Sequence, residues 1–234
     1  MKNDVGERTL NLNGVIAEES WFGDEVTPQM FADDLNADTG DVTVWINSPG
    51  GDCYSAARIY NMMKEYSGKV TVKIDARADS AASVVAMAGD AVFMSPAIAS
   101  MTIHNPMTMV VGNSADMDAA KAFLDEVKQS LINAYEAKTG LSRAKISRLM
   151  DAETNMSAGK AVALGFADGI LYGFRGDDQS DTANWDTYSP VAVANSLIER
   201  FTAKHGAKQI PPVEPAPKGV QIDQLDKRLS LISH

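Results

Sequence analysis

Two neighbouring serines and one histidine in this 234-residue sequence are candidates for nucleophilic catalysis. Ser80 and Ser83 stand in the segment ARADSAASVVAMAGD, just before an apolar run with helical character. A serine hydroxyl is a poor nucleophile at neutral pH unless a neighbouring base takes its proton. The other two histidines lie in the polar C-terminal part, so His104 is the candidate base. Together these residues predict acyl transfer by a Ser-His pair.

The elements that must position these residues alternate between strands and helices. Strand patterns run over residues 9–17, 41–47, 69–76, 91–95 and 100–104. Helical patterns run over residues 28–35, 53–66, 114–138, 142–151 and 157–165, with a short helix after the serines. This alternation predicts an α/β fold, with a mostly parallel, twisted sheet and flanking helices. Ligands of such sheets gather beyond the carboxyl ends of the strands, where the glycine-rich turn 48–52, the serines and His104 all fall.

Each of these residues also has a structural explanation. Ser83 could cap the following helix, which is a common role of serine. His104 could be a hydrogen-bonded residue at a strand end, and Gly50-Gly51 could form a turn that needs positive φ. Ser80 is interpreted as a turn or cap residue, because it lies three positions earlier and the helix begins later.

Composition excludes several classes of function. The net charge of −10 and pI near 4.7 argue against nucleic-acid binding, which needs clustered basic residues. No apolar run has the length of a membrane helix, and the first residues have no apolar signal-peptide core. Cys53 is the only cysteine, which fits a reducing cytoplasm. The scattered histidines and the single cysteine predict no metal site, and no cofactor is expected.

The sequence changes character after about residue 173. We expect one folded domain over residues 1–175 and a C-terminal extension over residues 176–234, partly disordered. The extension contains the proline-rich linker QIPPVEPAPKG.

Four motifs between Asp41 and Gly169 resemble the proteolytic subunit of the Clp protease, and especially its phage and prophage relatives that mature capsids. INSPGGD resembles the family's glycine turn, and SAASVVAMAGD its nucleophile segment. TIHNP resembles the histidine segment, with Thr102 in place of methionine, and ETNMSAGKAVALGFADGI the segment that carries the third triad member. The resemblance implies the Clp protease or crotonase-like fold.

The resemblance also implies roles for individual residues. Ser83 corresponds to the nucleophile and His104 to the general base. The backbone N–H groups of Gly51 and Val84 correspond to the oxyanion hole, which stabilises the tetrahedral intermediate. Gly50 and Gly51 would bind substrate as an added strand, and Gly51 would lack a side chain because the substrate backbone passes close by.

The third triad member is the main departure from the family. Glu153 stands where the Clp protease has aspartate, and Asp151, two positions earlier, is the alternative. A glutamate can still orient a histidine. The segment between the glycine turn and Ser83 is a few residues longer than in the Clp protease. The segment between Ser83 and His104 is a few residues shorter. This offset favours the phage relatives.

The resemblance implies a serine endopeptidase that matures phage capsids by cleaving scaffold or coat proteins in the host cytoplasm. Peptide hydrolysis itself needs no nucleotide, and the sequence has no P-loop. The amphipathic helix 114–138 resembles the family's ring-contact helix, which implies a homo-oligomeric ring; its apolar positions are Met117, Phe123, Leu124, Val127 and Leu131. Two alternatives stay open: a crotonase-like enzyme acting on acyl-CoA, and a catalytically inactive ring or assembly subunit.

Overall fold

The computed structural model describes residues 8–21 and 23–173 of the chain. All of them belong to one compact unit, which spans residues 1–185. The predicted extension 176–234 and its proline-rich linker lie outside the described residues. The domain boundary near residue 175 therefore stays a prediction.

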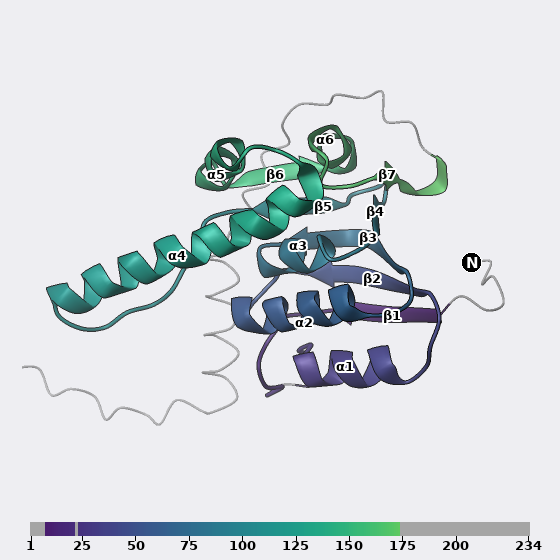
Figure 1. The fold of residues 1–234 in the computed structure, drawn as a ribbon, viewed down its shortest axis with the longest axis horizontal. Helices are drawn as coiled ribbons and strands as arrows, with labels where there is room; N and C mark the ends of the chain where they lie inside the picture. The colour runs from purple at the N-terminus through teal and green to yellow at the C-terminus, as the bar shows by residue number, and fades with distance from the viewer. Residues whose placement is uncertain (1–7, 22, 174–234) are drawn as a thin grey trace, which may run out of the picture. The chain divides into compact units, whose positions relative to one another are not determined.

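A seven-stranded sheet forms the centre of this unit (Figure 1). Five strands follow the order β1-β2-β3-β4-β7, and all their pairings are parallel. The strands are β1 (Arg8–Asn13), β2 (Val42–Ser48), β3 (Val70–Asp79), β4 (Ala91–Met94), β5 (Ser100–Ile103), β6 (Thr154–Ser157) and β7 (Gly169–Ile170). Only the β5–β6 pair is antiparallel within this described sheet. The predicted fold class is confirmed.

Strand β3 is longer than predicted, and its two halves have different neighbours. Its first half pairs with β4 from Thr71 to Ile74, and its last three residues pair with β5. The sequence pattern stopped at Ala76 because polar residues interrupt the apolar alternation there. The extra length matters for the site, since it aligns Asp79 with Thr102 on β5.

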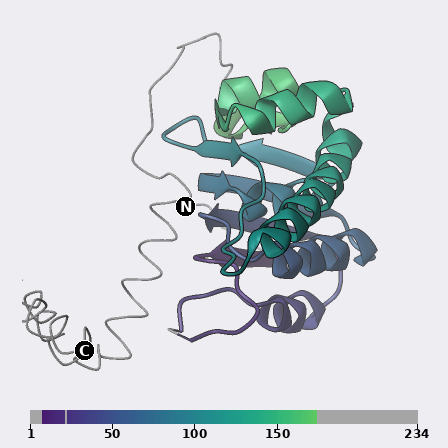
Figure 2. The same cartoon turned by 90° about the vertical axis from the view of Figure 1, so that its left-hand side faces the viewer.

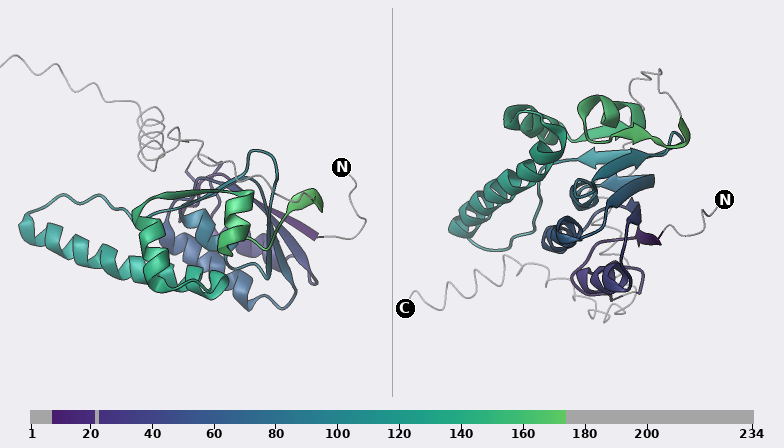
Figure 3. Two further views of the ribbon diagram at one scale, coloured as in Figure 1. Left: turned by 90° about the horizontal axis from the view of Figure 1, so that it is seen from above. Right: turned by 45° about the vertical axis from the view of Figure 1, so that its right-hand side comes forward.

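Six helices flank the sheet: α1 (Pro28–Asn36), α2 (Cys53–Glu65), α3 (Ala81–Ala86), α4 (Ser114–Thr139), α5 (Arg143–Asp151) and α6 (Ala158–Leu164). A short 3-10 turn, Leu171–Gly173, ends the described part. Figure 2 shows α1 and α2 beside each other on one face of the sheet. In Figure 3, α4 reaches past the strands, so much of it has no sheet beneath it.

Local signals explain where the helices begin and end. Thr27 caps α1 by accepting from the N–H of Met30, and proline occupies the first helical position. Asn113 and Asp116 form a reciprocal capping box at the start of α4. Gly140 ends α4 in the left-handed conformation.

The core explains why the strands read as apolar runs. Val44, Ile46, Val72 and Ile74 on the central strands are fully buried, as expected for a parallel sheet covered on both faces. All six residues of α3 are buried as well. Among the described residues, no helix has both the length and the apolar character needed to cross a bilayer.

Two short strands were not predicted. β6, with the sequence TNMS, has a single apolar residue, and β7 has only two residues, so neither gives a clear pattern. The first predicted strand, 9–17, ends at Asn13 instead. Gly14 turns the chain there with φ of 110°, and a Cβ at this position would lie 2.3 Å from the carbonyl oxygen of Asp24.

Candidate active site

The junction between β3 and α3 holds Ser80 in an uncommon backbone conformation. Ser80 has φ of 55° and ψ of −127°, which is the geometry of a turn position usually occupied by glycine. Its N–H donates to the carbonyl of Thr102 at 2.8 Å, which ties the turn to β5. Such a conformation in a non-glycine residue costs about 1–3 kcal/mol and is concentrated at functional sites. Ser80 thus occupies a turn, as interpreted from the sequence, at the N-cap position of α3, but its side chain makes no capping hydrogen bond.

Gly50 lies directly against this turn. A Cβ on Gly50 would lie 2.6 Å from the carbonyl oxygen of Asp79 and 2.8 Å from the Cβ of Ser80. The φ of Gly50 is also positive, at 89°. Only glycine therefore allows the SPGG turn and the Ser80 turn to pack together.

Gly51 exposes its backbone, but it is glycine for a different reason than predicted. A Cβ there would lie 2.0 Å from the carbonyl oxygen of Ile16, so this chain's own backbone, and not a substrate, excludes a side chain. Gly51 forms a parallel bridge with Ile16, and both hydrogen bonds of that bridge come from Gly50 and Asp52. The N–H and C=O of Gly51 consequently face away from Ile16.

Ser83 lies inside α3 and has no exposed surface. Its hydroxyl lies 2.6 Å from the carbonyl oxygen of Ser80 and 2.8 Å from the Tyr135 hydroxyl. Burial raises the pKa of Tyr135, and the hydrogen bond with Ser83 opposes this only in part. A hydroxyl enclosed in this way cannot reach a peptide carbonyl, which argues against the predicted role of Ser83 as nucleophile.

Val84, the predicted second oxyanion donor, is also poorly placed. It lies one turn into α3, where N–H groups are used by the hydrogen bonds of the helix. Ala81 is the first residue of α3, so its N–H has no acceptor within the helix. The N–H that lies next to Ser80 and is not used by the helix is therefore that of Ala81.

His104 immediately follows β5 and is half-buried. Its Nδ1 lies 2.6 Å from the carbonyl oxygen of Asn105. Because a carbonyl can only accept, Nδ1 carries the proton and Nε2 keeps its lone pair. Nε2 is buried and has no hydrogen-bond partner among the described residues. The ring is thus held in the tautomer that a general base needs, although no direct contact joins it to Ser80 in this structure.

Asp79, just before Ser80, is a charged group that the sequence analysis did not consider. Its Oδ1 is buried and unpaired within the described part of the chain. Burial raises the pKa of Asp79, while the hydroxyl of Thr102 and the charges of Arg77 and His104 oppose that rise. The electrostatics of Asp79 and His104 are therefore linked.

The two predicted candidates for the third triad member lie in different surroundings. In the antiparallel β5–β6 pair, the last paired residues are Ile103 and Thr154, so His104 and Glu153 are the residues just beyond this pair. Glu153 is exposed and has positive φ, 45°. Asp151 instead accepts hydrogen bonds from Asn105 at 3.0 Å and from Lys128 at 2.6 Å. Neither carboxylate contacts the ring, since Nδ1 is bonded to Asn105.

An apolar pocket of about 490 Å³ opens next to Ala81. It lies between α2, α3 and α4, and its lining includes Tyr60, Ala81, Val84, Phe123, Val127 and Leu131. Its position beside the residue after Ser80 suits a side chain of a substrate bound at this turn. No group of three or more potential metal ligands occurs within the described ranges.

Comparison with known proteins gives the family. Residues 4–173 match the family model described as Clp protease. The chain belongs to the Clp protease family. This membership agrees with the predicted enzyme class, a serine peptidase, and sets aside the acyl-CoA alternative.

Three relatives in this family illustrate the extent of the similarity. The ATP-dependent Clp protease proteolytic subunit 1 of Chlamydia muridarum is 32% identical over 133 residues, covering 55% of this chain and 69% of the relative. That of Chlamydia abortus is 29% identical over 183 residues, covering 73% and 93%. The proteolytic subunit of Deinococcus radiodurans is 26% identical over 154 residues, covering 65% and 76%.

The sequence contains a signal that separates the two serines. Ser80 stands at the strand-to-helix junction, whereas Ser83 is surrounded by residues of a helix that is apolar on all sides. The choice of Ser83 as candidate nucleophile did not use this signal. The same signal makes Ala81, the residue after Ser80, the alternative to Val84 as an oxyanion donor.

Proposed function

We propose that this Clp protease family member is a serine endopeptidase in which Ser80 is the nucleophile and His104 the general base. The observation that carries the proposal is the backbone of Ser80, strained at the junction of β3 and α3 and hydrogen-bonded to the strand that leads to His104. This assignment replaces Ser83, whose hydroxyl is buried against Tyr135.

The chemistry follows from the groups at the turn. Ser80 Oγ attacks the scissile carbonyl while His104 Nε2 takes its proton, which forms a tetrahedral intermediate. The N–H groups of Gly51 and Ala81 stabilise the negative oxygen, aided by the N-terminus of α3. His104 then gives the proton to the leaving amine, and a water molecule hydrolyses the acyl-enzyme by the same steps. The reaction requires no cofactor.

Glu153 is the residue we propose for the carboxylate that supports His104, because both residues lie just beyond the last pair of β5 and β6. The carbonyl of Asn105 keeps the hydrogen bond to Nδ1, so Glu153 would support the ring through its charge. Asp151 is less suitable for direct contact, because its Oδ1 already accepts hydrogen bonds from Asn105 and Lys128.

Substrate recognition would use backbone and one apolar side chain. The N–H and C=O of Gly51 face away from Ile16, so an extended peptide can pair with them as an added strand. Gly50 and Gly51 then form the substrate-binding turn, as predicted. The apolar pocket beside Ala81 favours a substrate with an apolar residue next to the cleaved bond.

Labelling with a fluorophosphonate probe distinguishes the two serines. We expect Ser80→Ala to abolish labelling and casein cleavage. Ser83→Ala should retain both and lower stability by about 2 kcal/mol, because it loses the hydrogen bonds to the Ser80 carbonyl and the Tyr135 hydroxyl. Mass spectrometry of the labelled peptide identifies the modified residue directly. Because both variants remove one hydroxyl within four residues, each is the control for the other.

Two results would contradict the proposal. Loss of labelling in Ser83→Ala but not in Ser80→Ala would restore the original assignment. Equal inertness of the wild type and both variants toward probe and casein would favour the inactive-subunit alternative.

A homo-oligomeric ring in the cytoplasm is part of the same proposal, with α4 as the contact helix. Its support is the exposure of apolar side chains on α4, such as Met117 and Phe123 at 45% each. Cleavage of phage scaffold or coat proteins stays a prediction. If Ser80 is the nucleophile, the segment from the glycine turn is three residues shorter and the segment to His104 three residues longer than when counted from Ser83. The difference in spacing that favoured the phage relatives is then smaller.

A further inference from the structure

The turn that follows His104 is held by polar contacts from two helices. Asn105 Nδ2 donates to Asp151 Oδ1 at 3.0 Å, and Lys128 Nζ donates to the same oxygen at 2.6 Å. Ser147 lies 3.4 Å from the other oxygen of Asp151. These contacts connect α4 and α5 with the segment after β5, although the residues are far apart in the sequence.

Asn105 connects this cluster to the histidine. Its backbone carbonyl accepts from His104 Nδ1, and its side chain is bound to Asp151. Asn105 Oδ1 is buried without a partner among the described residues, so the contact with Asp151 is what fixes the amide. Because the carbonyl and the side chain belong to one residue, fixing the side chain limits how the carbonyl can turn.

The charges favour this arrangement at neutral pH. Hydrogen bonds from Lys128 and Asn105 lower the pKa of Asp151, so it is a carboxylate that accepts from both. Asp151 is 54% exposed, and an exposed ion pair contributes little to stability. Global stability therefore does not explain the cluster.

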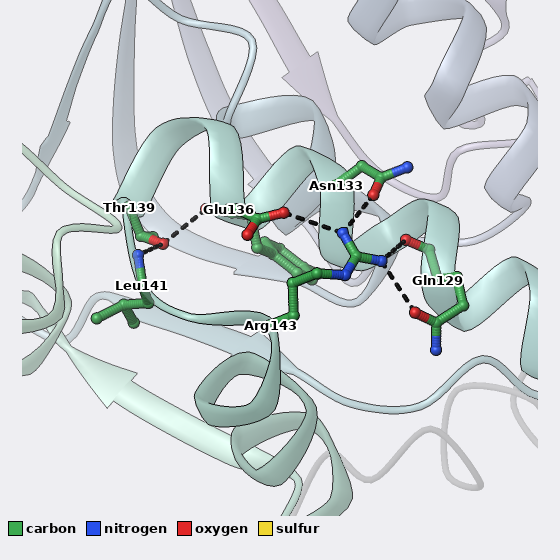
Figure 4. A network of polar contacts seen from close by, with 7 residues as sticks. Gln129, Asn133, Glu136, Thr139, Leu141 and Arg143 are labelled. Carbon is green, nitrogen blue, oxygen red and sulfur yellow. Dashed lines mark hydrogen bonds and ion pairs between the residues drawn. The ribbon is translucent and has the colours of Figure 1, made fainter.

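The helix α5, whose last residue is Asp151, is also fixed to α4 at its first residue. Figure 4 shows Arg143, the first residue of α5, bound to Gln129, Asn133 and Glu136 on α4. The distances are 2.6 Å to Asn133 and 2.9 Å to the other two side chains. The α4–α5 corner is thus a firm support for Asp151.

We propose that Asp151 is a positioning residue for His104, which acts through Asn105, and that Lys128 orients its carboxylate. The proposal rests on the proposed function, in which His104 is the general base. It differs from the predicted alternative, in which Asp151 would contact the ring itself.

The test compares variants of the full-length chain by their kinetics of fluorophosphonate labelling. We expect Asp151→Ala and Asn105→Ala each to lower the limiting labelling rate about 10-fold to 100-fold, since small displacements of a catalytic group have effects of this size. The probe concentration that gives half the limiting rate should stay unchanged. Asp151→Asn retains an oxygen acceptor and should recover part of the rate. The double variant should lose no more than either single one.

Lys138→Met is the matched control for Lys128→Met. Both lysines lie on α4 and are similarly buried. Lys128 pairs with Asp151 at 2.6 Å, and Lys138 pairs with Asp168 at 2.7 Å. The Lys138 pair has no connection to His104. We expect Lys128→Met to slow labelling and Lys138→Met to leave the rate unchanged.

A spectroscopic readout separates positioning from general destabilisation. In protein labelled with ¹⁵N-histidine, the His104 Nδ1–H proton should be protected from exchange in the wild type and should exchange faster in Asp151→Ala. Wild-type rates in Asp151→Ala, or an equal loss in Lys138→Met, would overturn the inference. If His104→Ala itself labels normally, the proposed function fails instead.

Discussion

At the scale of single residues, backbone conformation separates two serines that the sequence presents as near equivalents. Ser80 lies in a strained turn, and Ser83 lies three residues later on the buried side of a helix. Their hydroxyls are therefore in opposite environments. Asp79, the residue before the turn, is half-buried, and one of its carboxylate oxygens has no partner among the described residues.

Asp79 gives a pH-dependent prediction. Because burial raises its pKa in the folded protein, the folded state binds a proton more tightly than the unfolded chain. Ionised Asp79 therefore lowers stability at pH 7. We expect Asp79→Asn to unfold at higher urea concentration at pH 7, measured by circular dichroism. The advantage should fade as the pH falls through the raised pKa and vanish below about 3.9, the unfolded value.

The matched control for this change is Asp75→Asn, an exposed aspartate on the same strand. Its stability should follow that of the wild type at each pH. An advantage for Asp79→Asn that persists at low pH would contradict the ionisation argument.

At the scale of elements, the length of β3 and the packing of α3 create the candidate site. β3 continues past β4 to pair with β5, and this brings the turn at Ser80 beside the strand that leads to His104. The short helix α3 is stable only because every residue in it is buried. Tyr135 of α4 bonds to Ser83 of this helix. The Tyr135 ring also packs against that of Phe166, with the centroids 5.7 Å apart.

Tyr135→Phe tests this packing. The change removes the hydroxyl that bonds Ser83 and preserves the ring. We expect the free energy of unfolding to fall by about 1 kcal/mol. Ser83 keeps its contact with the carbonyl of Ser80, so labelling of Ser80 should persist.

Tyr54→Phe removes a hydroxyl from an exposed ring and serves as the comparison. Urea unfolding should show it unchanged within about 0.5 kcal/mol. If both variants lose equal stability, the buried hydrogen bond has no special role.

At the scale of the whole molecule, α4 exposes apolar side chains that this unit leaves uncovered. Its first turns carry apolar side chains in solvent, while only Ile132 and Tyr135 in its second half are fully buried. An apolar helix surface of this kind indicates association with another protein surface. In the proposed ring, that surface belongs to a second copy of the chain.

Met117→Glu tests the association. A charge at a position buried between copies should dissociate the oligomer, so we expect a lower mass in size-exclusion chromatography with light scattering. Ala115→Glu adds the same charge two residues earlier, outside the apolar set, and should leave the mass unchanged. A monomeric wild type would contradict the ring.

The sequence by itself determined the α/β class, the positions of most helices and the family-specific segments. Those features depend on local rules: apolar periodicity, caps such as Thr27 and Asn113, and stops such as Gly140. His104 could also be selected as the candidate base from the sequence, because the chain has only two other histidines and both lie in its C-terminal part. The reason for Gly51 was misjudged, since its conflict with Ile16 involves residues distant in the chain.

The burial of Ser83 and the contacts that hold His104 depend on contacts between distant parts of the chain. The extension of β3 along β5 depends on pairing between segments 20 residues apart or more, which no local pattern encodes. The bonds from Asn105 to Asp151 and from Ser83 to Tyr135 join residues 46 and 52 positions apart. Burial and hydrogen bonding of this kind are set by the packed fold, because they depend on which surfaces meet.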